Sequence, residues 1–418
     1  MPEMPRIVVL SSLFPGPNQP NAGVFIRERM FRVGRRVPMV VVAPMPWFPF
    51  QGLLRRFRPH FRPPAPRYET QQGFEVYRPR FLSVPALFKG LDGLSMAVFS
   101  LPTLWRLRRR FHFNLIDAHF AYPDGYAASL LGRWLRVPST VTLRGTEVPL
   151  SRSPHRRRLM LRALDRAARV FSVADSLRRH MAGLGADPQR IEVVGNGVDS
   201  ARFSPLPRGE ARGALNIPAH APVLVSVGGL VERKGFHRVI DCLPSLRQRH
   251  PGLQYLVVGG ASAEGDWSAR LQAQVEALNL QDTVRFLGPL PPDHLRGPLS
   301  AADVFVLATS NEGWANVFLE AMACGLPVVT TDVGGNPEVV LHESLGTIVP
   351  FGDSAALERA LDAALRRSWD RGQIREYAQQ NDWETRVDQL CKAFESVLKS
   401  EPGRPIPLAM EDANRGRN

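Results

Sequence analysis

Two carboxylates, Glu312 and Glu320, stand eight positions apart in the stretch EGWANVFLEAMACG. The run Asp303–Ala308 before it is short, apolar and β-branched, which is typical of a buried parallel strand. The tripeptide TSN that follows supplies turn and N-cap residue types, so we expect a helix to begin near Ala315 or Asn316. Glu312 would then stand in the loop and Glu320 about one turn inside the helix. The two carboxylates could then bind two separated parts of one ligand.

A second candidate site is the glycine-rich loop Gly228–Gly235, between an expected strand at Pro222–Val227 and an expected helix at Phe236–His250. Free backbone N–H groups and the helix dipole favour phosphate at such a place. Arg233 and Lys234 would add two cations beside it. The motifs GxGxxG and GxxxxGK[ST] are both absent here, so an ordinary basic turn is the alternative.

The first half of the chain offers two more candidates. Gly23 ends a loop between the expected strand Arg6–Leu10 and the expected helix Val24–Arg36, where a glycine permits close backbone approach to a ligand. An ordinary turn glycine is the alternative. His119 lies at the end of the expected strand Asn114–Phe120, a position suited to chemistry, although a lone histidine is more often structural.

Short apolar runs alternate with amphipathic helical patterns along the chain, which predicts an α/β protein with doubly wound parallel sheets. The chain has 418 residues, 44% hydrophobic and 22% charged, and exceeds what one core normally supports. We therefore expect a first domain at 1–200, a linker at 201–221, a second domain with terminal helices at 222–400, and a disordered tail at 401–418.

The positive charge belongs to the first half. Residues 1–200 hold 31 Lys+Arg and 13 Asp+Glu, a net charge of +18, whereas the remainder holds 22 and 26, a net charge of −4. A genomic base bias could enrich arginine, but it would act on both halves. A basic face that meets an anionic lipid surface or substrate explains the asymmetry better.

Two segments of the first half mix aromatic residues with arginine. Trp47–Pro66 has no regular period, and we expect an excursion from the sheet that is too irregular for a helix. Leu94–Phe113 predicts a helical segment interrupted at Pro102, with a dense arginine end. This composition suits a membrane interface; a surface loop with a solvated helix end is the alternative.

Several classes of protein are not indicated. The chain lacks a run of roughly 20 apolar residues that would span a membrane, and its first residues lack the layout of a signal peptide. We expect a cytoplasmic protein that associates peripherally with the inner face of the membrane. Cys242, Cys324 and Cys391 are widely spaced, which favours buried reduced thiols and no structural zinc.

Several motifs together resemble the family 4 retaining glycosyltransferases of the GT-B fold: VGGLVERKG, EGWANVFLEAMACGLPVV, GGNPEVV and GNGVD, with NAGVF, DAHFAYPDGYAA and TLRGTE in the first half. The resemblance extends from Ile7 to about Val397. It implies two Rossmann-like domains facing across a cleft, the first binding the acceptor and the second the nucleotide-sugar. It also implies a C-terminal helix that crosses back to the first domain.

The resemblance assigns roles to the candidate residues. Glu320 would bind the ribose hydroxyls, because a carboxylate accepts from two donors, and Glu312 would face the donor sugar. Lys234, with Arg233, would neutralise the leaving diphosphate. The backbone of the helix start would lie near the sugar and diphosphate through Trp314, Ala315, Asn316 and Val317.

The resemblance also covers the first domain. His119 would contact the sugar across the cleft, and Gly23 would let its loop approach the diphosphate or the acceptor. Arg144 follows a strand in the motif TLRGTE, and a structural role is its alternative. Glu338 is expected to order a helix start, with a nucleotide or sugar role second.

The phosphate loop departs from the family pattern. Gly228 and Gly229 belong to this loop, and the family usually has arginine where this chain has Gly229. Arg233 is the candidate replacement, from a different backbone position. Because the chain contains no DxD sequence and the cations already complement an anion, we expect no metal requirement.

The resulting hypothesis is transfer of a sugar from a UDP- or GDP-sugar to a lipid-linked or cell-surface glycan precursor, with retention of configuration. Front-side attack within an ion-pair-like state is expected, because no residue is convincing as a covalent nucleophile. No prosthetic group and no nucleic acid partner are expected. The alternatives are a nucleotide-sugar epimerase or hydrolase on the same fold, and a non-enzymatic basic protein that binds polyanions.

Overall fold

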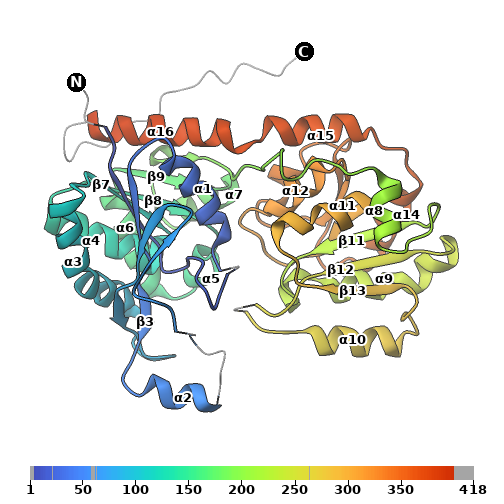
Figure 1. The fold of residues 1–418 in the computed structure, drawn as a ribbon, viewed down its shortest axis with the longest axis horizontal. Helices are drawn as coiled ribbons and strands as arrows, with labels where there is room; N and C mark the ends of the chain where they lie inside the picture. The colour runs from blue at the N-terminus through green and yellow to red at the C-terminus, as the bar shows by residue number, and fades with distance from the viewer. Residues whose placement is uncertain (1–3, 21, 58–61, 63, 263, 400–418) are drawn as a thin grey trace. The chain divides into compact units, whose positions relative to one another are not determined.

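The computed structural model describes residues 4–20, 22–57, 62, 64–262 and 264–399 (Figure 1). The chain forms two compact units. Unit 1 consists of Met1–Gly195 and Arg386–Asn418, and unit 2 of Asn196–Thr385. The tail expected to be disordered, 401–418, lies outside the described residues. Within those residues, none of the helices is both long and apolar enough to cross a membrane.

Unit 1 is built on an eight-stranded sheet. Its strands pair in parallel, except that β4 is antiparallel to β5. In sheet order they are β10 (Ile191–Val193), β9 (Arg169–Ser172), β8 (Ser139–Leu143), β7 (Leu115–His119), β1 (Ile7–Leu10), β2 (Met39–Val42), β5 (Phe74–Tyr77) and β4 (Tyr68–Gln71). A separate parallel pair joins β3 (Met45–Trp47) to β6 (Arg80–Leu82).

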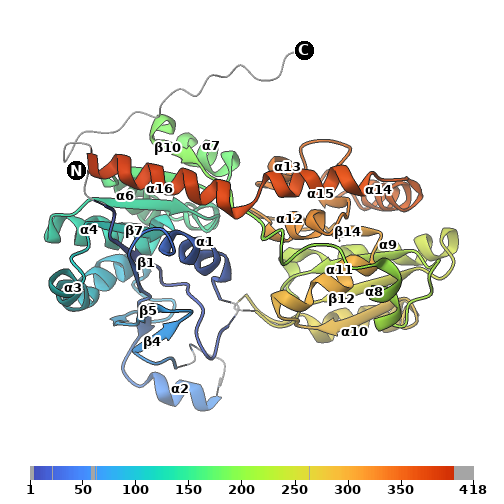
Figure 2. The same cartoon turned by 45° about the horizontal axis from the view of Figure 1, so that its top comes forward.

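Helices cover both faces of this sheet (Figures 1 and 2). On one face the core joins Met30 of α1 (Val24–Gly34) to Phe394 of α16 (Trp383–Lys399), and on the other it joins Leu104 of α3 (Asp92–Arg110) to Leu131 of α4 (Tyr126–Leu135). The remaining helices are α2 (Gln51–Phe57), α5 (Glu147–Leu150), α6 (Pro154–Arg166) and α7 (Asp175–Gly183). The part of α16 from Arg386 onward belongs to unit 1, so the expected return of the C-terminal helix is confirmed.

Unit 2 contains a six-stranded, fully parallel sheet. Its order is β13 (Val284–Gly288), β12 (Gln254–Val258), β11 (Val223–Val227), β14 (Val304–Leu307), β15 (Val328–Thr331) and β16 (Gly346–Val349). One face packs against α8 (Arg208–Ala214), α11 (Arg296–Ala301), α12 (Asn316–Ala323) and α15 (Arg371–Gln380). The other packs against α9 (Phe236–Arg249), α10 (Ser268–Ala277) and α14 (Ser354–Arg366).

The two ends of unit 2 are hydrogen-bonded to each other. Val198 N–H donates to the carbonyl of Asn381 at 3.1 Å, and Trp383 N–H donates back to the carbonyl of Val198 at 3.3 Å. A Cβ on Gly197 would stand 2.6 Å from the Trp383 nitrogen, so only glycine allows the two backbones to meet so closely. The segment that enters unit 2 and the segment that leaves it therefore form one junction.

Three expectations about local structure need correction. The segment 201–221 is part of unit 2 and not a bare linker, because α8 forms there and Phe203, Ala211 and Ile217 pack into the core. Within Trp47–Pro66, seven residues form α2 although no apolar period marks them. The helix expected to break at Pro102 continues through it, because buried residues on both sides hold it against the sheet.

Candidate functional site

The turn from β14 to α12 places both carboxylates of the sequence motif. The helix begins at Asn316, as predicted, with Ala315 at its N-cap position. Phe318, Leu319 and Met322 anchor its buried face. Glu312 lies in the loop before the helix, and Glu320 lies in its second turn, half-buried. The two carboxylates thus stand on one strand-to-helix connection, at the carboxyl edge of a parallel sheet where ligands bind in such folds.

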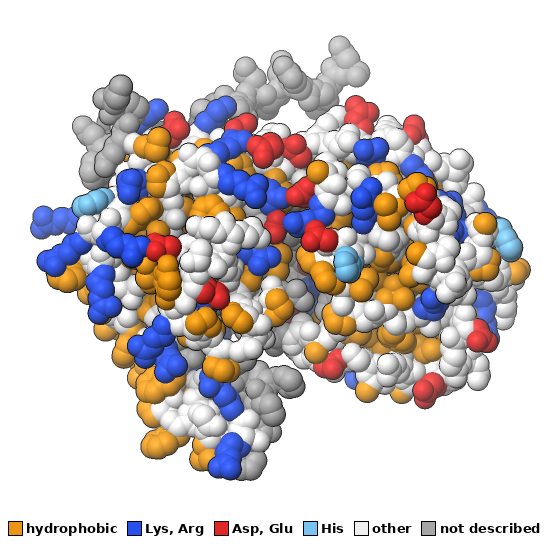
Figure 3. Space-filling model, viewed as in Figure 1, with side chains coloured by type: hydrophobic (Ala, Val, Ile, Leu, Met, Phe, Trp, Pro, Cys, Tyr) orange, Lys and Arg blue, Asp and Glu red, His pale blue; other side chains and the backbone are white. Residues whose placement is uncertain are grey.

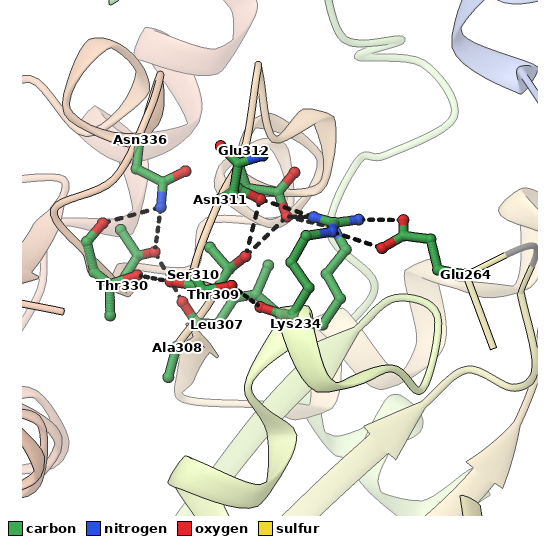
Figure 4. A network of polar contacts seen from close by, with 12 residues as sticks. Lys234, Glu264, Leu307, Ala308, Thr309, Ser310, Asn311, Glu312, Thr330 and Asn336 are labelled. Carbon is green, nitrogen blue, oxygen red and sulfur yellow. Dashed lines mark hydrogen bonds and ion pairs between the residues drawn. The ribbon is translucent and has the colours of Figure 1, made fainter. Parts of the chain in front are cut away.

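Glu312 holds both cations of the glycine-rich loop (Figure 4). Its Oε1 atom lies 2.7 Å from Lys234 Nζ, 2.9 Å from Arg233 Nη1 and 3.2 Å from the hydroxyl of Thr309. The Glu312 side chain is only 10% exposed and the Lys234 side chain 16%. The structure therefore brings the two predicted loop cations and the predicted loop carboxylate into one cluster.

Arg233 also contacts a second carboxylate. Its Nε and Nη2 atoms donate to the two oxygens of Glu264, at 2.8 and 2.6 Å, and its Nη1 atom donates to the carbonyl of Asn311 at 2.8 Å. The hydrogen bonds to Glu264 and the charge of Glu312 raise the pKa of Arg233 above its usual value. The pKa of Glu264 is lowered, first by its hydrogen bond from Arg233.

Two glycines allow the loops to approach. Gly235 has φ +76°, and a Cβ there would lie 1.9 Å from the carbonyl oxygen of Ala308; Ser310 N–H donates to the carbonyl of Arg233 at 2.8 Å. Gly334 has φ +52°, and a Cβ there would lie 1.8 Å from the carbonyl oxygen of Glu312. The backbone around Glu312 is therefore fixed from two sides by main-chain contacts.

Replacement of Gly334 by alanine is expected to lower the free energy of unfolding of unit 2 by more than about 2 kcal/mol, because left-handed strain and a backbone clash coincide. Gly352→Ala is the matched control. It has φ +87° with open space around the position, so it should cost only about 1 kcal/mol. Urea unfolding followed by fluorescence checks both, and equal costs would contradict a specific contact at Glu312.

A buried amide binds the end of β15, and Thr331 links that end to the segment after β14. Asn336 is fully buried, and its Nδ2 atom donates to Thr330 Oγ1 at 3.1 Å and to the carbonyl of Thr331 at 3.0 Å. Thr331 Oγ1 in turn donates to the carbonyl of Thr309 at 2.5 Å. Glu338 lies two residues further along, within the short helix α13 (Asn336–Val339). The GGNPE motif thus orders the edge on which Glu312 stands.

The start of α12 offers main-chain donors. No side chain caps the helix at Ala315, and the first N–H groups of an α-helix have no partner within the helix. The Asn316 side chain accepts a hydrogen bond from Asn196 Nδ2 at 2.9 Å, which ties the motif GNGVD to this helix start. Trp314 and Val317 flank the start, half-buried. The arrangement suits an anion placed before the helix.

The glycine-rich loop is tightly packed at Gly229, where the resemblance predicts an arginine. A Cβ on Gly229 would lie 3.0 Å from Cβ of Ser262, so the loop that follows β12 fills the space beside it. Gly228 N–H donates to the carbonyl of Val258 at 3.0 Å. Arg233 lies in the single turn Glu232–Lys234 that precedes α9. Arg233 contributes the guanidinium that contacts Glu312, and its replacement of the family arginine stays a prediction.

His119 lies in the interior of unit 1. Its Nδ1 atom is 3.0 Å from Arg144 Nη2, and because a guanidinium only donates, Nδ1 accepts and Nε2 carries the proton. Nε2 lies 3.4 Å from Asp117 Oδ2. Burial lowers the pKa of His119 well below its usual value, and the charges of Arg144 and Arg29 lower it further. The imidazole is therefore neutral, and a role at the donor sugar stays a prediction.

Arg144 and Gly23 also make structural contacts in unit 1. Arg144 lies over the ring of Phe25, 5.3 Å from its centroid. Gly23 has φ +71° and precedes α1, and a Cβ there would lie 2.4 Å from the carbonyl oxygen of Leu13. The close approach at Gly23 is thus to its own loop, which favours the turn alternative. A ligand role for either residue stays a prediction.

Two buried carboxyl groups order the loops at this edge of unit 1. Glu147 accepts from the backbone N–H groups of Ala121 at 2.9 Å, Arg144 at 3.1 Å and Gly145 at 2.7 Å. Asp124 accepts from the N–H of Ser12 and, at 2.9 Å, from its hydroxyl. Burial raises the pKa of Asp124 to about 7, although the Ser12 hydrogen bonds oppose this. The carboxyl of Asp124 thus keeps its proton to unusually high pH.

This raised pKa makes the stability of unit 1 depend on pH. An unfolded aspartate loses its proton near pH 4, whereas Asp124 keeps it up to about pH 7, so folding becomes less favourable as pH rises through this window. The slope approaches about 1.4 kcal/mol per pH unit. Asp124→Asn should therefore flatten the decline, measured by urea unfolding between pH 4.5 and 7.5. The exposed Asp165→Asn is the control, and an unchanged slope in Asp124→Asn would contradict the assignment.

Metal-ligand groups and cysteines are the remaining side chains that could carry chemistry. In the part of the chain that the structure describes, His, Cys, Asp and Glu form no group of three suited to a metal ion. The three cysteines are free; Cys242 and Cys324 are buried, and Cys391 is half-buried. Cysteine chemistry is therefore not indicated at these positions.

Sequence reasoning missed several residues of the unit 2 cluster. Glu264, Thr309 and Gly334 contact Arg233 or Glu312. Thr309 was noted only as a turn residue and Gly334 only as part of the GGNPE motif, and Glu264 lies in neither segment. Glu264 follows no recognisable pattern, because its partner is 31 positions away and their pairing depends on how two loops pack. Positive φ at Gly334 could have been suspected from the double glycine before Asn336.

Two family models match the chain. The model of the glycosyl transferases group 1 matches residues 207–381, and the model of Glycosyltransferase Family 4 matches residues 50–202. Among curated relatives, a D-inositol 3-phosphate glycosyltransferase of Corynebacterium urealyticum is 32% identical over 68% of this chain and 72% of its own length. The putative teichuronic acid biosynthesis glycosyltransferase TuaC of Bacillus subtilis is 27% identical over 79% and 82%.

Other relatives match over a shorter stretch. The D-inositol 3-phosphate glycosyltransferase of Saccharomonospora viridis is 36% identical, but the match spans about half of either protein, 54% of each.

Among solved structures, the sucrose-phosphate synthase of Thermosynechococcus elongatus superposes with a TM-score of 0.75 at 20% identity, covering 95% of this chain and all of that one. Anabaena HepE in complex with UDP-glucose gives a TM-score of 0.71 at 21% identity, covering 94% of this chain and all of that one.

Proposed function

The chain belongs to glycosyltransferase family 4 and has the GT-B fold, and on that premise we propose that it transfers a sugar from a nucleotide-sugar to an acceptor with retention of anomeric configuration. The observation that carries the proposal is the cluster of Lys234 and Arg233 around Glu312, beside the open start of α12. Two cations and a helix N-terminus at one sheet edge complement a diphosphate.

The proposed roles follow the chemistry of each group. Lys234 and Arg233 offset the charge that accumulates on the diphosphate as the glycosidic bond breaks, and the first N–H groups of α12 bind the phosphate oxygens. Glu320, one helical turn further, accepts from the ribose hydroxyls. Glu312 orients the two cations and faces the sugar. Its Oε1 atom already carries three contacts, which agrees with front-side attack better than with a covalent intermediate.

The cations also support a reaction without a metal ion. The solved structure of Anabaena HepE is a complex with UDP-glucose, and we propose a UDP- or GDP-sugar for this chain. Addition of EDTA to the purified enzyme should then leave the rate unchanged. The base and the sugar are set by loops whose backbone contacts carry little sequence signature, so a panel of nucleotide-sugars is the experiment that identifies them.

The proposed acceptor is a lipid-linked or cell-surface glycan precursor at a membrane. The relatives do not indicate one acceptor. The Corynebacterium urealyticum protein is named for D-inositol 3-phosphate, and TuaC is named for teichuronic acid biosynthesis. Support comes from unit 1, where a set of apolar side chains on and before the outer face of α3 is 44–74% exposed: Leu87, Phe88, Leu91, Leu94, Val98, Phe99 and Trp105. We call this set the α3 surface.

Arginine side chains adjoin the α3 surface, and Figure 3 shows basic and hydrophobic side chains close together on unit 1. The exposed residues Arg106, Arg109 and Arg110 follow in the last turns of the helix, and Arg109 stacks on Trp105 at 3.6 Å from the ring centroid. The opposite face of α3 is already buried through Met96 and Leu104, so the exposed apolar side chains are not needed for the core. Such a surface suits an anionic bilayer, where rings enter the headgroup region and guanidinium groups meet phosphates.

The membrane part of the proposal predicts a specific loss. Phe88→Asp combined with Phe99→Asp should abolish flotation of the protein with vesicles that contain anionic lipid, because charge replaces two exposed rings. The control is Leu341→Asp in unit 2, which is similarly exposed at 54%. Equal flotation of wild type and the double variant, or no preference for anionic over neutral vesicles, would contradict membrane association.

The catalytic part is tested by binding and by product analysis. Calorimetry against UDP and GDP should detect nucleotide binding, and NMR of the product should show the anomeric configuration of the donor retained. Product analysis without acceptor separates the enzyme from an epimerase or hydrolase. Absence of binding to either nucleotide would overturn the proposed function.

A further inference from the structure

Arg233 is occupied on the side by which arginine binds oxyanions best. Its Nε and Nη2 atoms form a parallel pair of N–H groups, the geometry that takes two oxygens of one phosphate or carboxylate. Glu264 occupies this pair with both carboxylate oxygens, at 2.8 and 2.6 Å. The other terminal nitrogen, Nη1, is used by Glu312 and the carbonyl of Asn311. A diphosphate cannot bind this pair of N–H groups while Glu264 holds it.

Because Gly229 has no side chain, there is room beside it for the loop that carries Glu264. Ser262 lies where a Cβ at position 229 would come within 3.0 Å of it. The Ser262 N–H and the Gly265 N–H each donate to the carbonyl of the other residue, at 2.9 and 3.1 Å, so main-chain hydrogen bonds hold the residues close to Glu264. Glycine in place of the family's arginine at position 229 therefore lets this loop pack closely. The same loop carries the carboxylate that binds Arg233.

The charges of the cluster balance in this state. Arg233 and Lys234 contribute two positive charges, and Glu312 and Glu264 contribute two negative ones. A neutral cluster attracts a diphosphate weakly, whereas release of Glu264 leaves a net positive charge beside the start of α12. The Glu264 side chain is 51% exposed, so it can turn into solvent without burying a charge.

We propose that Glu264 is an internal anion that holds the paired N–H groups of Arg233 in the nucleotide-free protein and is exchanged for diphosphate oxygens when the donor binds. This inference rests on the proposed function and names the residue that sets donor affinity. Glu264 is a competitor of the diphosphate, so its presence weakens donor binding and eases release of the nucleotide product.

The experiment compares the dissociation constants of UDP and GDP, by calorimetry, in wild type and in variants. Glu264→Gln removes the charge at nearly constant shape and should tighten binding about two- to fivefold, the range for a half-exposed ion pair. Arg233→Gln should weaken binding about tenfold or more. In the double variant the Glu264→Gln substitution should have no further effect, because the competitor has lost its target. Glu276→Gln, an exposed carboxylate of α10, is the control for loss of one negative charge.

Three outcomes overturn the inference: weaker binding by Glu264→Gln, which would make Glu264 a positioning residue for Arg233; unchanged binding; or equal tightening by Glu276→Gln. These outcomes leave the proposed function intact, because the wild type still binds nucleotide. If the wild type binds neither UDP nor GDP, the proposed function fails and the exchange fails with it. Inorganic pyrophosphate as a second probe should show the same tightening, since the competition concerns the diphosphate and not the base.

Discussion

Replacement of Lys234 by methionine is expected to lower kcat about 10²- to 10³-fold, the usual cost of removing one preorganised charge from a developing anion. The Lys234 ammonium lies 2.7 Å from Glu312 and its side chain is 16% exposed, so it acts in a partly desolvated place where a charge is worth more than in water. Methionine keeps the aliphatic stem and removes only the charge.

Steady-state kinetics with saturating donor checks this expectation. Lys234→Arg restores a charge with a different shape and should recover part of the rate. Lys392→Met, an exposed lysine of α16 in unit 1, should behave as wild type. A normal kcat with only a raised KM in Lys234→Met would mean that Lys234 stabilises the bound substrate and the transition state equally. This result would contradict its role on the leaving diphosphate.

The second large effect is expected at Glu320. Its replacement by alanine should raise the dissociation constant of the nucleotide about 10- to 100-fold, the cost of charge-assisted hydrogen bonds to two hydroxyl groups. The carboxylate stands on α12, whose buried residues Phe318 and Leu319 fix the helix against the sheet, so little reorganisation is available to compensate.

A comparison of UDP with 2′-deoxy-UDP makes this test specific. The wild type should prefer the ribonucleotide, and Glu320→Ala should lose that preference because the group that reads the hydroxyl is gone. Glu320→Gln keeps an acceptor and should show an intermediate loss. If the preference for the ribonucleotide survives in Glu320→Ala, the ribose is held by another residue.

The architecture could be predicted because its signals are local. The strand Val304–Leu307 and the helix start at Asn316 follow from a short apolar run, a polar turn and helical periodicity, all within about 20 residues. The same holds for β7 and its terminal His119. The missed helix α2 lacks this kind of signal, and the continuation of α3 through Pro102 depends on buried contacts on both sides that no local rule reports.

The candidate site was predictable only in part. Glu312, Arg233 and Lys234 were found from motifs, but the hydrogen bonds that join them depend on two loops from different strands. Glu264 was not found at all, because the approach of its loop to Arg233 follows from the space left at Gly229 and from no pattern in its own sequence. The neutral state of His119 likewise follows from burial and from Arg144, and a sequence motif reports neither.

The junction between Val198, Asn381 and Trp383 gives unit 2 a modular character. The chain enters and leaves unit 2 at neighbouring positions, and main-chain hydrogen bonds join the two ends of the unit. A segment of this kind can be exchanged as one cassette between related enzymes, with both splice points in a single junction. Under the proposed function, such an exchange would alter the donor while unit 1 and its α3 surface stay as they are.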